Sequence, residues 1–143
     1  IGPIRPSRNY QLTVNIRPTA TAAHWRSVLH FTSGGNIGKV GTRIPAMMFM
    51  NKSTRLSIRS GRAGHHNDGC APMQQLALHR TTKVKIRVAG GQLKIWYNGR
   101  LVCRRTSYQR PDHTTRPVHV YAGAPWYNSA HGTVSKLVYQ KLR

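Results

Sequence analysis

Residues 92 to 103 carry the strongest folding signal in this chain, because two apolar-alternating runs flank Asn98-Gly99. The Asn-Gly pair readily takes the two positive φ angles that a type I′ turn requires, so this stretch predicts a β-hairpin. Successive side chains of a strand point to opposite faces. One face of the hairpin is therefore apolar and carries Leu93, Ile95 and Tyr97. The other face carries Gln92, Lys94 and Trp96.

The same alternation recurs along the chain and is clearest from Lys83 to Val88. There Val84, Ile86 and Val88 face inward, and the outward positions form a basic row of Lys83, Lys85 and Arg87. We expect Lys94 to lie near this row if the two strands pair. The further strands that the pattern predicts are residues 10–16, 24–31, 43–50, 55–59, 118–122 and 133–142. Short strands separated by Gly and Pro, with no helical pattern, predict an all-β antiparallel sandwich.

The length of 143 residues predicts one domain. Residues 1–9 hold prolines and arginines with little apolar content and predict an extended N-terminal arm. Residues 10–143 then form the single β-sandwich domain. The start at Ile1-Gly2-Pro3 resembles the product of processing, and no hydrophobic run approaches the length of a membrane span.

Charge is the feature that most constrains function. The chain has 23 Lys and Arg against 2 acidic residues, Asp68 and Asp112, which gives a formal net charge of +21. A compact domain with this balance repels itself, so a polyanion is expected in its working state. Nucleic acid, sulfated or carboxylated polysaccharide, anionic membrane and silica all fit this requirement. Arginine outnumbers lysine, which favours bidentate contacts to oxyanions.

The predicted polyanion-binding residues come from two parts of the chain. Those expected on the sheet are Arg55, Arg59, Lys83, Lys85, Arg87 and Lys94. Those expected on the basic loop from residue 104 to residue 117 are Arg104, Arg105 and Arg110. The alternative interpretation is that these cations are ordinary solvated side chains.

The scarcity of acids argues against several kinds of chemistry. Two aspartates at positions 68 and 112 do not resemble the carboxylate pair of a glycosidase, and calcium sites need more carboxylate oxygens. No G-x-S-x-G motif is present. The adjacent His65 and His66 point in different directions on most backbones, which disfavours a metal site. We therefore expect no enzyme activity, no metal and no other cofactor.

Cys70 and Cys103 are the two cysteines of the chain. They can pair with each other in one way, so the sequence predicts a disulfide in an exported protein. Two free, buried thiols are the alternative. If the disulfide forms, it ties the end of the predicted hairpin to the loop from residue 61 to residue 72.

Several motifs, taken in their order along the chain, resemble one family. They are Leu29-His30-Phe31-Thr32, Gly34-Gly35-Asn36, residues 38–46, residues 54–58, residues 97–102, residues 118–122, Pro125-Trp126-Tyr127-Asn128 and Gly132. Together they resemble the concanavalin A-like, laminin-G-like jelly-roll domains found in secreted and matrix proteins of marine invertebrates. The resemblance spans about residues 10 to 140. It implies a two-sheet jelly roll, export to an extracellular matrix or skeletal material, and a binding role toward carbohydrate or matrix.

The resemblance does not carry over a calcium-dependent sugar site or hydrolase activity, because the acidic residues of those sites are missing here. The leading hypothesis is a secreted protein that binds or templates an anionic phase, such as silica or sulfated polysaccharide. Self-assembly would need anions to screen the basic strand edges. The alternatives are nucleic-acid binding, with stacking by Trp96, Tyr108, Trp126 and Tyr127, and a lectin or antimicrobial role in which Trp126 and Tyr127 stack on a sugar. For Trp126 and Tyr127, buried core positions are the favoured interpretation.

Overall fold

The computed structural model describes residues 7–114, 116–123 and 126–142, and this part of the chain contains strands and no helix. The strands are β1 (Asn9–Pro18), β2 (Arg26–Thr32), β3 (Ala46–Phe49), β4 (Leu56–Arg59), β5 (Gly69–Cys70), β6 (Thr82–Ala89), β7 (Gln92–Tyr97), β8 (Arg100–Arg105), β9 (His119–Tyr121) and β10 (Gly132–Leu142). Residues 1–6 of the predicted arm lie outside the described residues.

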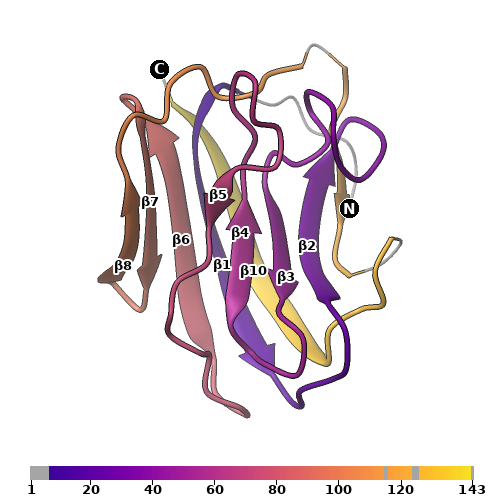
Figure 1. Cartoon of the computed structure of the whole chain (residues 1–143). Helices are drawn as coiled ribbons and strands as arrows, with labels where there is room; N and C mark the ends of the chain where they lie inside the picture. The colour runs from indigo at the N-terminus through magenta and orange to yellow at the C-terminus, as the bar shows by residue number, and fades with distance from the viewer. Residues whose placement is uncertain (1–6, 115, 124–125, 143) are drawn as a thin grey trace.

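The strands form two antiparallel five-stranded sheets that pack face to face (Figure 1). We call the first the β6 sheet, with the order β10-β1-β6-β7-β8, and the second the β3 sheet, with the order β5-β4-β3-β2-β9. In Figure 1, β5, β4 and β3 lie in front of β1 and β10, while β8, β7 and β6 are seen at the left. The prediction of an all-β, two-sheet antiparallel sandwich of the jelly-roll type is confirmed.

The hairpin at residues 92 to 103 is confirmed as β7 and β8. Asn98 and Gly99 have φ angles of 50° and 81°, so both turn residues lie in the left-handed region that a type I′ turn needs. The strand Thr82–Ala89 pairs with the hairpin in the register that the alternation predicts, with Arg87 opposite Lys94. The basic row therefore continues from β6 onto β7.

The core fills the space between the sheets with the apolar face of each strand. The β6 sheet contributes the inward residues Leu12, Val14, Val84, Ile86, Val88, Leu93 and Ile95. The β3 sheet contributes Leu29, Phe31, Met47, Phe49, Leu56 and Ile58. Tyr10 reaches across this layer, and its hydroxyl lies 2.7 Å from Ser60 Oγ, which gives this buried polar group a partner.

Two predictions about local structure were wrong. Arg104 and Arg105 were expected on a loop, but they end strand β8, opposite Lys94 and Leu93. Consecutive arginines break the apolar alternation, yet backbone pairing with β7 continues past the irregularity between Ile95 and Trp96. Residues 43–49 are buried as expected, but Met50 is half-buried and only Ala46–Phe49 is strand.

Candidate anion-binding surfaces

The outward side of the β6 sheet is a continuous cationic surface, which we call the basic face. Its cations are Arg17, Lys83, Lys85, Arg87, Lys94, Arg104 and Lys136. The alternation of buried and exposed residues along β1, β6 and β7 sets their direction. Asp68 and Asp112 both have partners elsewhere, on Arg62, Arg105 and His66. Among the described residues, the basic face therefore has no acidic side chain.

Three of these cations stand directly opposite one another on neighbouring strands. Arg87 on β6 pairs in register with Lys94 on β7, and Lys94 pairs with Arg104 on β8. We call this row the cation ladder. Like charges directly opposite in a sheet destabilise it. The ladder ends at β1, where Arg87 Nη1 donates to Gln11 Oε1 at 3.1 Å.

Lys85 and Trp96 form a cation–π pair beside the ladder. They occupy opposite positions of β6 and β7, and Lys85 Nζ lies 4.8 Å from the centroid of the indole ring. On the same side of the ladder, at and beyond the level of Lys85, a hollow of about 320 Å³ is lined by Thr13, Asn15, Lys83, Lys136 and Val138. The basic face thus offers cations, amides and a hydroxyl side by side.

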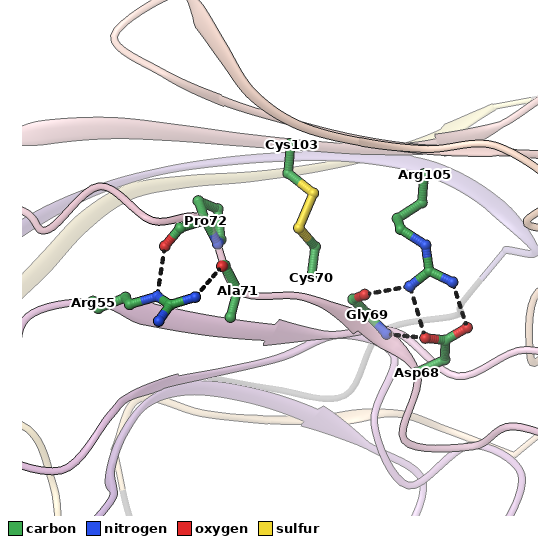
Figure 2. The surroundings of a disulfide bond; sticks show 8 residues. All are labelled: Arg55, Asp68, Gly69, Cys70, Ala71, Pro72, Cys103 and Arg105. Atoms are coloured by element: carbon green, nitrogen blue, oxygen red, sulfur yellow. Dashed lines mark hydrogen bonds and ion pairs between the residues drawn. A yellow bond between two sulfur atoms is a disulfide. The ribbon is translucent and has the colours of Figure 1, made fainter.

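Arg55 and Arg105 lie on either side of the disulfide and bind the protein's own backbone (Figure 2). Arg55 donates to Pro72 O at 3.0 Å and to Ala71 O at 2.8 Å. Arg105 Nη1 donates to Asp68 Oδ1 at 2.9 Å and to Gly69 O at 2.7 Å. These contacts fix the segment around β5, so both arginines have structural partners.

The predicted disulfide between Cys70 and Cys103 is present and joins β5 to β8 (Figure 2). These are edge strands of the two different sheets. The bond therefore fastens the two layers of the sandwich along one side, and it ties the hairpin to the loop as the sequence suggested.

Asp68 is the main anionic partner in this region. Burial alone would raise the pKa of its carboxyl, but hydrogen bonds from Arg105, Arg62 and the Gly69 amide outweigh burial and hold the pKa at about 2. Asp68 therefore stays ionised through the physiological range and neutralises charge on Arg62 and Arg105.

The nine predicted cations do not form one site. Lys83, Lys85, Arg87, Lys94 and Arg104 share the basic face, and sequence reasoning missed Arg17 and Lys136 there. Arg55 and Arg105 flank the disulfide. Arg110 lies in a loop beside Ala63, whose amide donates to the Arg110 carbonyl oxygen. Arg59 belongs to the β3 sheet and faces the opposite side of the molecule.

Arg59 lines a cavity on the outer face of the β3 sheet, which we call the arginine cavity. It has a volume of about 260 Å³ and is lined by Trp25, Ile37, Arg43, Met48, Ser57, Arg59, Asn67 and Tyr127. Met48 and Ser57 are opposite residues of β3 and β4 and form its floor. Of these residues, the sequence had singled out Arg59 and Tyr127 as candidates.

The aromatic pair at residues 126 and 127 is divided between two environments. Tyr127 lines the arginine cavity. Trp126 is 39% exposed, so it is not a core residue, and its ring packs against His30 and Tyr121. Burial lowers the pKa of His30 and outweighs its hydrogen bond to Thr42 O, which favours the neutral ring under Trp126.

Among the described residues, no group of three or more His, Cys, Asp or Glu side chains is arranged to hold a metal ion. Within the same residues, no helix is long and apolar enough to cross a membrane.

Comparison with known proteins gives structural relatives only. No protein-family model matches the chain, and no curated protein matches it in sequence. A putative carbohydrate binding protein from Bacteroides ovatus is similar in structure, with a TM-score of 0.67 and 13% identity, covering 97% of this chain and 40% of that one.

Two further solved structures are similar over nearly the whole chain. Domain 4 of AbnA, an extracellular GH43 arabinanase from Geobacillus stearothermophilus in complex with arabinotriose, has a TM-score of 0.61 and 15% identity over 96% of this chain and 63% of its own. A sialidase from Trypanosoma rangeli has a TM-score of 0.61 and 17% identity over 94% of this chain. This chain spans about a fifth (21%) of the sialidase. At these identities the likeness establishes the β-sandwich fold.

Proposed function

We propose that this chain is a secreted, non-catalytic binding domain that holds an anionic extracellular polymer on its basic face. The observation that carries the proposal is the cation ladder, in which Arg87, Lys94 and Arg104 stand opposite one another with no acidic side chain on the described part of the face. Like charges in register oppose folding of the sheet, so a bound anion is the partner that relieves the repulsion.

The preferred polymer is a sulfated or carboxylated polysaccharide. The guanidinium group of arginine binds sulfate and carboxylate oxygens in a bidentate manner. Gln11, Thr13 and Asn15 lie beside the cations, where they can form hydrogen bonds with sugar hydroxyls. Of the structural relatives, the Bacteroides protein is a putative carbohydrate binding protein, and the Geobacillus domain is in complex with arabinotriose. The resemblance to laminin-G-like domains of marine-invertebrate matrix proteins supports the same class of partner.

Silica is a second candidate because its surface combines anionic silanolates with silanol hydroxyls. Hydroxyl side chains among the cations favour silica. They belong to Thr13, Thr133 and Ser135, which lie on outward positions of β1 and β10. Fixed cations and hydroxyls in one plane would concentrate silicate and template its condensation without a catalytic centre.

Two alternatives receive less support. Nucleic-acid binding by stacking needs open aromatic faces, but Tyr108 is fully buried and Lys85 covers the Trp96 ring on the basic face. Trp126 is exposed, but its ring packs against His30 and Tyr121 and lies away from the cation ladder. Hydrolysis needs free carboxylates, whereas Asp68 is bonded to two arginines and Asp112 is buried against His66.

The test is a salt series of binding to heparin, a polyuronate, silica particles and duplex DNA. A ladder variant, Arg87→Gln/Lys94→Gln/Arg104→Gln, is compared with a matched variant that loses three exposed cations elsewhere, Lys52→Gln/Arg80→Gln/Arg116→Gln. We expect the ladder variant to reduce the slope of log K against log salt for the polysaccharides far more than the matched variant does.

Two results would overturn the proposal. Equal losses in the two variants would mean that binding follows net charge and has no site. Tighter binding to DNA than to heparin at every salt concentration would exclude the extracellular polymer as the preferred partner.

A further inference from the structure

The arginine cavity lies on the sheet opposite to the basic face, and its character is different. The cations of the basic face are spread along several strands, whereas the arginine cavity is one hollow of about 260 Å³, near the lower limit of roughly 300 Å³ for small-molecule sites. Its lining combines two aromatic residues with two guanidinium groups. This combination points to a small ligand that has both a flat apolar face and a negative charge.

Arg43 is the buried cation of the cavity, with 3% of its surface exposed. Its Nε donates to Asn36 O at 2.9 Å, Nη1 to Asn67 Oδ1 at 2.8 Å, and Nη2 to Asn36 Oδ1 at 3.0 Å. A longer contact of 3.4 Å runs from Nη2 to the Tyr127 hydroxyl. These hydrogen bonds order three loops around the cavity. Because the partners are neutral, they leave the charge of Arg43 uncompensated.

Arg59 supplies a second positive charge on the cavity wall. Its Nε donates to Ser57 Oγ at 2.9 Å, and its Nη1 lies 3.5 Å from Asn67 O, while its Nη2 group donates to no described residue. Burial lowers the pKa of this guanidinium, the Asp68 carboxylate raises it, and the charge on Arg43 lowers it further. Asp68 forms its ion pairs with Arg62 and Arg105, so it does not bond Arg59 directly.

A buried cation without an ion-pair partner, such as Arg43, is costly, and the half-buried Arg59 at the same cavity adds a repulsive like charge. An anion in the cavity would remove both penalties and would accept hydrogen bonds from the free Nη2 group of Arg59. Trp25, which is 38% exposed, and Tyr127 offer ring surfaces at the same cavity. A pyranose ring that carries one carboxylate or sulfate matches this pattern of charge and apolar surface.

We propose that the arginine cavity is a separate binding site for one anionic sugar residue, either a uronate or a sulfated pyranose. The arginine cavity binds one sugar residue per protein molecule, whereas the basic face binds a polymer through its many cations. The proposal does not depend on the basic face, because it rests on different residues of the other sheet.

The test uses isotope-labelled protein titrated with glucuronic acid and with N-acetylglucosamine 6-sulfate, followed by amide, indole and guanidinium N–H signals. Glucose, N-acetylglucosamine and inorganic sulfate serve as comparison ligands. We expect saturable shifts at the Trp25 indole N–H and the Arg59 Nε–H with both anionic sugars. Glucose and N-acetylglucosamine are expected to cause no such shifts, and inorganic sulfate should bind more weakly than the sulfated sugar.

Two variants of the cavity are compared with one of the basic face. Arg59→Gln and Trp25→Ala should each weaken anionic sugar binding by about tenfold or more, and both residues are partly exposed, so the fold should persist, as the amide spectrum will show. Lys94→Gln should leave sugar affinity unchanged. Conversely, Arg59→Gln should leave the salt slope of heparin binding unchanged, which separates failure of this site from failure of the basic face.

The inference is overturned by shifts that never saturate, by equal binding of neutral and anionic sugars, or by an affinity that Arg59→Gln does not change. Binding of inorganic sulfate as tight as that of the sulfated sugar would reduce the site to a simple anion site and would also contradict it.

Discussion

Lys85 Nζ lies 4.8 Å from the centroid of the Trp96 ring, across two strands that place these residues directly opposite each other. The ring therefore holds one cation of the basic face in place and is itself shielded by it. A cation–π pair at an exposed site contributes about 0.5 to 1 kcal/mol.

We expect a double-mutant cycle to show this coupling. Trp96→Leu and Lys85→Gln, alone and together, should give an interaction free energy of about 0.5 to 1 kcal/mol in urea denaturation. The cycle removes the separate packing contribution of each side chain. If the losses of unfolding free energy in the two single variants add up to the loss in the double variant, the contact does not contribute to stability.

Lys94→Glu should change stability and binding in opposite directions. The glutamate would stand between Arg87 and Arg104, so two repulsive cross-strand pairs become attractive. We expect the free energy of unfolding to rise by roughly 0.5 to 2 kcal/mol, as two such pairs allow. The variant should elute from a heparin column at a lower salt concentration than the parent protein.

The matched control is Arg80→Glu, which changes net charge equally at an exposed loop position. It should have little effect on stability and a smaller effect on heparin retention. If Lys94→Glu destabilises the protein instead, the ladder is not under repulsive strain and the argument for a bound anion on the basic face fails.

Removal of the disulfide should cost roughly 3 to 4 kcal/mol of unfolding free energy, since Cys70 and Cys103 are 33 positions apart and close a loop of that length. Cys70→Ser/Cys103→Ser can be compared with the parent protein in urea, with and without a reductant. The reductant should destabilise the parent alone. A parent protein that has free thiols by mass measurement would contradict the bond.

Acid should weaken the fold through Asp68. Its pKa is about 2 in the folded protein and 3.8 when unperturbed, so its hydrogen bonds stabilise the fold above about pH 4, and this contribution disappears as the pH falls toward 2. The expected contribution is roughly 1 to 2 kcal/mol after allowance for its partial exposure.

Asp68→Asn isolates this effect from the protonation of the eight histidines. The variant should be less stable than the parent at pH 7, and the difference should shrink as the pH is lowered from 5 to 2. Parallel stability curves for the two proteins over this range would show that Asp68 does not stabilise the fold through its charge.

Much of the fold was predictable because period-two alternation fixes which face of a strand is buried. That rule placed Leu93, Ile95 and Tyr97 in the core and put Lys94 beside Arg87. It misplaced the end of β8, because consecutive arginines carry no alternation while backbone hydrogen bonding continues.

The sites were less predictable, because they depend on which sheet each strand joins. Arg59 and Lys85 have the same outward pattern in sequence but lie on opposite faces of the sandwich. The sequence gives little indication that Arg43 belongs to a site, because it is a single cation at the start of an apolar run. Its importance arises from Asn36, Asn67 and Tyr127, which only the folded chain brings to it.

The bond between Cys70 and Cys103 acquires a mechanical meaning when the two candidate surfaces are considered together. The basic face and the arginine cavity belong to different sheets, and this bond is the covalent cross-link between edge strands of those sheets. If a polymer on the basic face and a sugar-bearing chain held in the arginine cavity were pulled apart, the load would cross the sandwich. The disulfide would then hold β5 to β8 against separation of the two sheets.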